Sequence, residues 1–366
     1  MKLLSGKKQA WVVLIQTKPL TGQCPHCGAP ACRLAYHSRY TLRSGQPVLV
    51  FRCRQCRKTF CDRLGTAFYD LKTPEEKVQR AIQQGLEGLC PEAVARVEGV
   101  HSTTVQGWVD RACSQAKAAD KEVITGVSTQ NVELDELHSF AGAKHPDEQD
   151  SDLEEVGQHW THVAMARESR LMLEVIVGPR TQESATELVE GAARRLTPDC
   201  WPLWSSDGWE PYLFALTVVF AVLIHFIKGK GRGRPKDSQV VPDPRVRYGQ
   251  VIKQRAGRRL AAVTRGVILG VEELIPLKQI STSLLERLNG TIRQQVAPLH
   301  RKTRSFAKCR TALDTQTQLF KSYYNLCRKH GTLKGKTPAQ AAGLSDHCWT
   351  LRELLTFNAA IISKIT

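Results

Sequence analysis

The stretch NVELDELHSFAGAK (Asn131–Lys144) decides the fold, because it places several carboxylates inside a predicted β-strand. Val132 and Leu134 favour a strand that packs against an apolar core. Three acids interrupt the apolar pattern, and they are Glu133, Asp135 and Glu136. A carboxylate in such a strand needs a charged partner, a metal ion or an edge that faces water. The residues alone do not choose among the three acids.

Four further elements follow this strand in an order that predicts one sheet. Strands are predicted at Thr161–Ala166 and Leu171–Val177, a helix at Thr181–Leu196 with Thr181 as its N-cap, and a strand at Trp201–Asp207. The order strand, strand, strand, helix, strand matches the ribonuclease-H-like topology, in which acids of the first and fourth strands approach each other. We therefore predict an α/β protein with a ribonuclease-H-like catalytic domain.

A helical segment downstream offers a further acid for the same site. In LLERLNGTIRQQ (Leu284–Gln295), Glu286, Asn289 and Arg293 fall at i, i+3 and i+7 and share one helix face. Three carboxylates from separate elements suit magnesium, and two such ions about 4 Å apart can drive phosphoryl transfer on DNA. The competing interpretation is that Glu286 is a surface acid paired with Arg287 or Arg293.

Two CxxC pairs near the start of the chain predict a structural zinc site. CPHC and CRQC are separated by 25 residues, and the segment between them carries a Gly-Gln-Pro turn typical of a ribbon hairpin. Two such pairs can supply the four soft ligands that tetrahedral zinc prefers. The predicted zinc ligands are Cys24, Cys27, Cys53 and Cys56.

The next segment, Pro91–Ala112, predicts a helix-turn-helix with its turn at Gly99. Apolar residues at helical spacing on both sides of the turn would bury one face of each helix, and they include Val94, Val97, Val105, Trp108 and Val109. The side chains left available to DNA would be those of Thr104, Gln106 and Arg111. A plain helical hairpin is the alternative.

The formal net charge of +17 is distributed unevenly along the chain. Residues 1–130 carry +9, residues 131–211 carry −11, and residues 212–366 carry +19. Lys and Arg that neutralise phosphates release counterions and so drive binding to nucleic acid. The charge pattern therefore predicts a polyanion partner, nucleic acid first, and a basic but solvated surface is the alternative.

Apolar content and cysteine usage predict a cytoplasmic protein that contacts no membrane. The run Trp11–Ile15 is too short for the core of a signal peptide. The run Leu213–Ile227 has 15 residues, fewer than the roughly 20 that span a bilayer, and its β-branched and aromatic content favours buried sheet. Twelve cysteines without an export signal favour metal binding over a disulfide scaffold.

Five segments resemble, in the same order, those of transposases of the insertion-sequence-1 family, which have a DDE-type catalytic centre. They are CPHC…CRQCRKTF, VEGVHSTTVQGWV, ELDE…GAK, WSSDGWEPY and LLERLNGTIRQQVAPLHRKTRSFAK. The resemblance implies Asp135, Asp207 and Glu286 as catalytic acids that hold Mg²⁺ or Mn²⁺. It implies that the zinc ribbon and helix-turn-helix recognise the terminal inverted repeats, and that the catalytic domain cuts these ends and joins them to target DNA. The implied partner is double-stranded DNA, bound by a homodimer or larger assembly.

The chain departs from compact members of that family in one region, where we predict an insertion at about residues 213–275. The insertion contains GKGRGRPK, whose Arg232 and Arg234 resemble an AT-hook core that enters a narrow minor groove. A flexible charged loop is the alternative. Beyond it, Arg245–Gly270 predicts a hairpin around Ala256-Gly257, interpreted as an added DNA-contacting β element.

These features together predict four domains and a set of basic residues beside the active site. The domains are a zinc ribbon at 20–65, a helix-turn-helix at 70–122, the catalytic domain at 128–330 and a tail at 331–366. The residues predicted to follow the DNA backbone are Arg293, Arg301, Lys302 and Arg304.

The leading functional hypothesis is therefore an active DNA transposase. A catalytically silent regulator that keeps only the DNA-binding modules is the alternative from another class. A nuclease that cuts DNA without joining it is the third.

Overall fold

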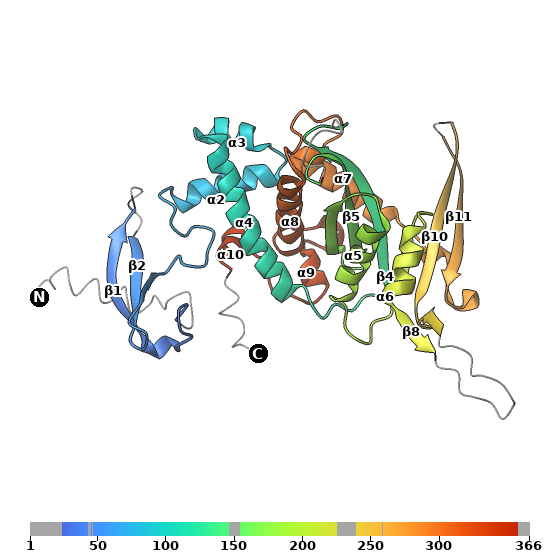
Figure 1. Cartoon of the computed structure of the whole chain (residues 1–366), viewed down its shortest axis with the longest axis horizontal. Coiled ribbons are helices and arrows are strands. Elements are labelled where there is room, and N and C mark those ends of the chain that lie inside the picture. The colour runs from blue at the N-terminus through green and yellow to red at the C-terminus, as the bar shows by residue number, and fades with distance from the viewer. Residues whose placement is uncertain are drawn as a thin grey trace, which may run out of the picture. The chain divides into compact units, whose positions relative to one another are not determined.

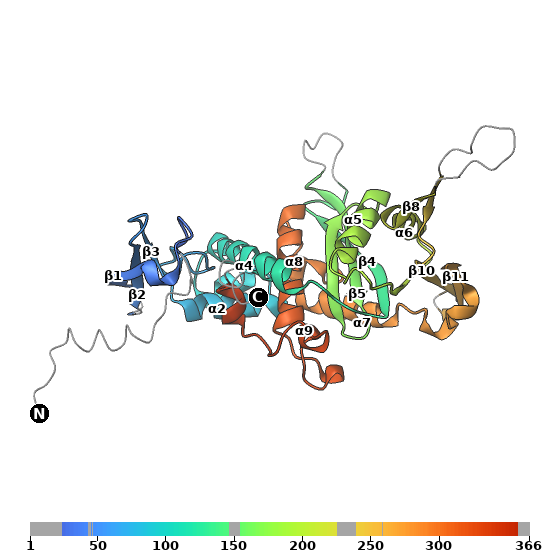
Figure 2. The same cartoon turned by 90° about the horizontal axis from the view of Figure 1, so that it is seen from below.

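The computed structural model describes residues 24–42, 45, 47–145, 154–224, 239–257 and 259–357. The chain divides into two compact units (Figures 1 and 2). Unit 1 is Met1–Gln84, Pro91–Glu122 and Thr350–Thr366, and unit 2 is Gly85–Cys90 and Val123–Trp349.

Unit 1 contains a small antiparallel sheet in the order β1-β2-β3, followed by helices. Its elements are η1 (Ala31–Arg33), β1 (Leu34–Thr41), β2 (Pro47–Cys53), β3 (Thr59–Cys61), α2 (Glu75–Leu86), α3 (Pro91–Glu98), α4 (Ser102–Val123) and α10 (Leu351–Leu355). The predicted ribbon hairpin is β1–β2, and Gly45 in its turn has φ 83°, a conformation that glycine adopts without strain.

The predicted helix–turn–helix order in unit 1 is confirmed, with one error in the buried face. Gly99 joins α3 to α4 at φ 61°, and Val94 and Trp108 are buried as expected. Val97 is 65% exposed, so its predicted burial is wrong. Glu98 is buried instead, one turn after Val94, because its carboxylate accepts hydrogen bonds at 2.8–2.9 Å from Arg80 and Gln84 of α2.

Unit 2 is built on a six-stranded mixed sheet in the order β11-β10-β7-β4-β5-β6. The pairs β4–β7 and β7–β10 are parallel, and β4–β5, β5–β6 and β10–β11 are antiparallel. Its strands are β4 (Asn131–Ala141), β5 (Gly157–Ala166), β6 (Leu171–Gly178), β7 (Leu203–Ser206), β10 (Arg247–Ala256) and β11 (Arg259–Leu269), with the separate pair β8 (Ala221–Ile224) and β9 (Gln239–Pro242).

Helices follow and flank these strands along the chain (Figure 1). They are α5 (Gln182–Ala193), α6 (Pro211–Val219), α7 (Ser283–Gln295), α8 (Arg310–Leu326) and α9 (Pro338–Ala341), with short 3₁₀ turns η2 (Glu272–Leu274), η3 (Leu277–Gln279), η4 (Ala297–Leu299) and η5 (Gly331–Leu333). The predicted order of three strands, a helix and a strand is confirmed in β4, β5, β6, α5 and β7. Thr181 caps α5 as predicted, because its side chain accepts from the backbone N–H of Ser184.

Two expectations for the segment after β7 are wrong. The apolar run Leu213–Ile227 is not buried sheet, since its first part lies in α6 and its next part in the exposed strand β8. Pro211 at the first turn favours a helix there, and Phe214 remains 54% exposed. The predicted hairpin forms as β10–β11, but it is not an addition to the fold, because β10 pairs with β7 and completes the central sheet.

The outer strand β6 is covered by α8, which prevents it from presenting a free edge. The side-chain amide of Asn325 donates to the carbonyl of Met172 at 2.8 Å and accepts from its N–H at 2.9 Å. Gln318 donates to the carbonyl of Val175 in the same strand, also at 2.8 Å. Helix α8 therefore takes the place of a further strand.

A largely buried acid of the outer strand β6 connects the sheet to two helices. Glu174 of β6 is 2.8 Å from Nζ of Lys321 on α8, whose side chain is 0% exposed, and 3.2 Å from Nη2 of Arg195 after α5. Burial raises the pKa of Glu174, but the charges of Lys321 and Arg195 outweigh it and hold the pKa below its usual 4.5. A Cβ at Gly191 would lie 2.6 Å from Cγ of Glu174, so this close approach requires glycine.

We predict that Lys321→Met destabilises the protein by about 3 kcal/mol, because removing one partner of a buried ion pair leaves the other poorly compensated. A carboxylate with a lowered pKa stabilises the fold above its unfolded pKa, and this contribution is lost as the pH falls. The wild-type protein should therefore lose stability below about pH 4.5 more steeply than Lys321→Met does. Urea unfolding at pH 7 and pH 4 measures both effects, and equal acid sensitivity in the two proteins would contradict the role of the pair.

Candidate functional site

The register of the central sheet brings two of the predicted acids to neighbouring strands. Strands β4 and β7 are parallel, and Glu133 is paired with Ser205. Asp135 and Asp207 each lie two residues beyond this pair in the same direction, so Asp207, which directly follows the end of β7, is found at the level of Asp135 in β4. The side chain of Asp207 also accepts from the backbone N–H of Trp209 at 3.0 Å, which fixes its direction.

Helix α7 adds the third acid, on the face predicted from the sequence. Asn289 donates from Nδ2 to Oδ2 of Asp135 at 2.7 Å. Glu286 lies one turn earlier on the same face, and it is close enough to Asp135 to raise the pKa of that carboxyl. Arg293 lies one turn later, and burial and the charge of Arg301 lower its pKa, while the charge of Asp135 acts in the opposite direction. All three residues of this face therefore interact with Asp135, Asn289 by a hydrogen bond and Glu286 and Arg293 through their charges.

The electrostatics of Asp135 show how closely the acids are gathered. Burial raises the pKa of Asp135 to about 7, and the neighbouring Glu136 contributes to the increase, as do Asp207 and Glu286. Carboxylates that share one site disfavour each other's ionisation. Within the described part of the chain, no ion pair reaches Asp135. The cluster is therefore a site of concentrated negative charge that favours a cation.

The three acids do not form a closed ligand set. Within the described residues, their oxygens do not all lie within 4.8 Å of one another, a spacing that the four cysteines of unit 1 do meet. Glu286 is turned toward β10, where it pairs with Lys253, and its Oε1 also accepts from the hydroxyl of Thr282 at 2.7 Å. Lys253 is a partner that the sequence did not suggest, because the candidates named there were Arg287 and Arg293.

The two other acids of β4 have structural partners. Glu133 is fully buried and accepts from the backbone N–H of Leu285 at 2.8 Å, with Arg167 at 3.4 Å. Glu136 accepts from Arg180 at 2.6 Å and from the hydroxyl of Tyr212 at 3.0 Å. Burial raises the pKa of both acids, that of Glu133 to about 7. Asp135 differs from both, because its side-chain partner is a neutral amide.

Aromatic rings hold the arginine that pairs with Glu136. The guanidinium of Arg180 lies 4.6 Å from the ring centre of Trp209 and 5.0 Å from that of Trp160. Such stacking fixes a planar cation on both sides. No pattern in the sequence indicated this cluster or the pair of Lys253 with Glu286. The partners are far apart along the chain, and the tertiary fold brings them together.

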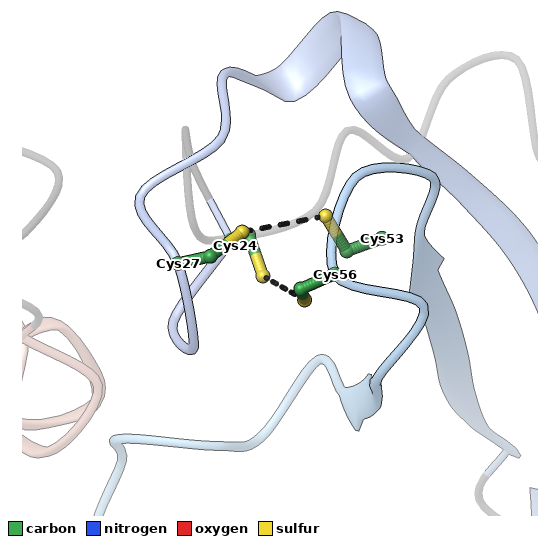
Figure 3. Close-up of side chains that lie close together, drawn as sticks. All are labelled: Cys24, Cys27, Cys53 and Cys56. Atoms are coloured by element: carbon green, nitrogen blue, oxygen red, sulfur yellow. Dashed lines mark hydrogen bonds between the residues drawn. The ribbon is translucent and has the colours of Figure 1, made fainter.

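The four predicted zinc ligands converge in unit 1 (Figure 3). The Sγ–Sγ distance is 3.7 Å for Cys24–Cys56 and 3.7 Å for Cys27–Cys53, and all four sulfurs lie within 4.8 Å of one another. A tetrahedral ion with Zn–S bonds of about 2.3 Å separates its sulfurs by about 3.8 Å. The cluster can therefore hold a structural zinc ion without rearrangement.

The zinc cluster is also the centre of the small core of the ribbon. Cys24 and Cys53 are buried together with Phe51 and Phe60, and the two phenylalanine ring centres are 6.0 Å apart. A core of this size stabilises little by itself, so metal binding and folding of the ribbon are coupled.

The predicted DNA-contacting residues of the helix-turn-helix lie on α4. Thr104 is exposed. Gln106 donates to the carboxylate of Asp110 at 2.9 Å, and Arg111 donates to the carbonyl of Tyr69 at 2.7 Å. Contacts within the protein therefore already engage Gln106 and Arg111, and their role in DNA binding stays a prediction.

The predicted basic residues after α7 partly gather in one pocket. Arg293, Arg301 and Lys302 line a pocket of about 380 Å³ together with His138 at the end of β4. Arg304 is exposed. The remaining predicted DNA-contacting residues, Arg232 and Arg234, lie outside the described residues.

We predict that zinc binds with one equivalent per chain, and that Cys53→Ser loses the metal and unfolds the ribbon, because one thiolate of four is removed. Cys32→Ser is the matched control, since Cys32 is exposed and outside the cluster. Elemental analysis of the purified proteins gives the metal content, and full zinc occupancy in Cys53→Ser would contradict the assignment.

We predict that Glu133→Ala destabilises the protein by about 3 kcal/mol, because it leaves the N–H of Leu285 and the charge of Arg167 without their buried partner. Glu133→Gln should cost less, about 1 kcal/mol, since its amide oxygen still accepts from Leu285. Denaturant unfolding compares the two variants. An equal loss in both would show that the hydrogen bond to α7 is unimportant.

Comparisons with known proteins identify no family for this chain. No protein-family model and no curated protein matches it. Among solved structures, the crystal structure of the Mos1 strand transfer complex matches with a TM-score of 0.15 and 7% sequence identity, over 38% of this chain and 52% of that chain. The match spans about half of that chain, and its TM-score is too low to support a fold or a function. In the described part of the chain, no helix combines the length and the apolar character needed to cross a bilayer.

Proposed function

We propose that the protein is a DDE-type DNA transposase, similar to the insertion-sequence-1 family, that cleaves DNA strands and transfers them to a target. The observation that carries the proposal is geometric. Asp135 of β4, Asp207 just after the parallel strand β7 and Glu286 of α7 come from three separate elements of one sheet domain. Asn289, one turn after Glu286, donates to the half-buried Asp135 at 2.7 Å. The strand order β6-β5-β4-β7-β10, with β5 antiparallel to its neighbours, agrees with a ribonuclease-H-like domain.

The choice of Asp135 among the acids of β4 follows from its partners. Glu133 and Glu136 are each held by an arginine and a second donor, so they serve the structure. Asp135 is oriented by Asn289, whose amide occupies one oxygen and leaves the carboxylate uncompensated. This is the environment in which a carboxylate binds a cation.

The donor set fits magnesium, because three carboxylates supply the hard oxygen ligands that this ion prefers. When bound, the metal would activate the attacking oxygen and neutralise charge on the leaving oxygen. In the absence of a cation, Lys253 neutralises Glu286. The two side chains are 33% and 41% exposed, so the pair can separate without opening the core.

The remaining parts of the chain would supply DNA binding. Arg293, Arg301 and Lys302 line a pocket next to the end of β4, where they would contact the backbone of a bound strand. The zinc ribbon and the helix-turn-helix of unit 1 would recognise the ends of the element. Two DNA ends must be held together for transfer, so we propose that the protein acts as a dimer or larger assembly.

The test is metal-dependent cleavage and joining of duplexes that contain the DNA flanking the gene. Asp135→Asn, Asp207→Asn and Glu286→Gln should each lose more than about 100-fold in both reactions with Mg²⁺ or Mn²⁺, since loss of a metal ligand costs more than loss of its outer partners. Glu273→Gln, which removes an exposed acid of η2, is the control and should retain activity. Full activity in all three variants would overturn the proposal.

The alternative is a catalytically silent DNA-binding protein of the same origin. The specific observation in its favour is that Glu286 is held by Lys253 and Thr282 and does not close the ligand set. Tight binding to the flanking DNA without cleavage under either metal, in both the wild-type protein and Lys253→Met, would support this alternative.

A further inference from the structure

A second basic pocket lies on the other face of α7. Its volume is about 330 Å³. Helix α7 contributes Arg287, Leu288 and Thr291 to its wall, residues that alternate along the helix with Glu286 and Asn289 of the acidic site. The opposite wall comes from the end of α8 and the residues after it, including Tyr324 and Arg328. None of the residues predicted from the sequence to bind DNA or metal lines this pocket.

The lining of this pocket is strongly cationic. Four permanently charged side chains and one histidine line it, and they are Arg170, Arg287, Arg328, Lys329 and His330. None of its lining residues is an acid. Their charges act on one another, because burial lowers the pKa of His330 and the three arginines lower it further. A solvated basic face would spread these charges apart, whereas here they converge on one cavity.

Two nitrogen atoms of the pocket are buried and have no hydrogen-bond partner among the described residues, and the guanidinium nitrogen of Arg328 is a donor in every state. Nη1 of Arg328 and Nε2 of His330 have no hydrogen-bond partner within the described part of the protein. The ring of His330 is held by an edge-on contact with Tyr324, whose ring centre is 4.9 Å away and which is only 2% exposed. A buried guanidinium donor without a partner carries a free-energy cost that a ligand accepting hydrogen bonds would remove.

The backbone of Arg170, which also lines the pocket, has an unusual conformation. This residue has φ 60°, in the left-handed region that glycine or asparagine occupies at least cost. It lies in the turn between β5 and β6, and its guanidinium donates to the carbonyl of Arg167. Strained backbone positions cluster at functional sites.

We propose that this pocket binds phosphate, carried either by the backbone of DNA or by a free nucleotide. Arginine forks match the oxygens of phosphate, and a terminal phosphate or neighbouring backbone phosphates supply several negative charges at once. A pocket of this volume is at the lower end of the range for small-molecule sites. The inference does not depend on the proposed catalytic function, because it uses none of the three acids of that site.

The test uses the full chain with pyrophosphate and ADP as probes, measured by isothermal titration calorimetry. Arg287→Gln and Arg328→Gln should each weaken binding of these probes about tenfold or more, since a charge-assisted hydrogen bond is lost. Arg194→Gln, which removes an exposed arginine after α5, is the matched control and should bind as the wild type does. Arg287 is exposed, so its variant carries the test if Arg328→Gln unfolds the protein.

A second arm distinguishes the two sources of phosphate. If DNA occupies the pocket, a short duplex competes with ADP, and each variant lowers the slope of log K against log salt by about 1 relative to Arg194→Gln. If a free nucleotide is the ligand, ADP binding is lost in the variants while duplex binding and its salt slope are unchanged. If pyrophosphate, ADP and duplex all bind the two variants as they bind Arg194→Gln, the pocket does not bind phosphate and the proposal is overturned.

Discussion

The hydrogen bond from the backbone N–H of Leu285 to the buried carboxylate of Glu133 holds the candidate site together. It joins two segments that are 152 positions apart in the chain. The first N–H groups of a helix have no partner within the helix, and they attract negative charge. By meeting this need, Glu133 fixes the start of α7 against β4, and the next residue, Glu286, is thereby placed beside Asp135. The geometry of the site therefore depends on an acid whose own contacts are with Leu285 and Arg167.

Local patterns were sufficient to predict much of unit 2, and they failed where the deciding contact is distant. Strands β5 and β6 and the Thr181 cap could be predicted, because alternation and capping act within a few residues. The prediction of buried sheet for Leu213–Ile227 is wrong, because β-branched and aromatic residues suit both a strand and an apolar helix. Pro211 at the first turn favours the helix that forms. The hairpin β10–β11 was found from its turn at Gly257, but its pairing with β7 is a long-range choice that its own residues do not encode.

The candidate site shows the same limit at the level of single side chains. Three acids of β4 looked equivalent in the sequence, and only their partners distinguish them. Glu136 accepts hydrogen bonds from Arg180 and Tyr212, while Asp135 accepts one from the side-chain amide of Asn289 in α7. These partners lie 44 to 154 positions away along the chain. The helix face of Glu286 could be predicted because its register is local, whereas its pairing with Lys253 required the position of β10.

The proposed DNA partner requires positive charge close to the acidic site. A cluster that raises the pKa of Asp135 to about 7 repels phosphate unless positive charge lies nearby. Screening limits that compensation to about 8 Å at physiological salt, so only residues next to the site contribute. Lys253 and Arg293 meet this requirement on the acidic face, and Arg287 adds a cation on the other. In the proposed function, the bases that flank the single acid of α7 would offset its repulsion of phosphate.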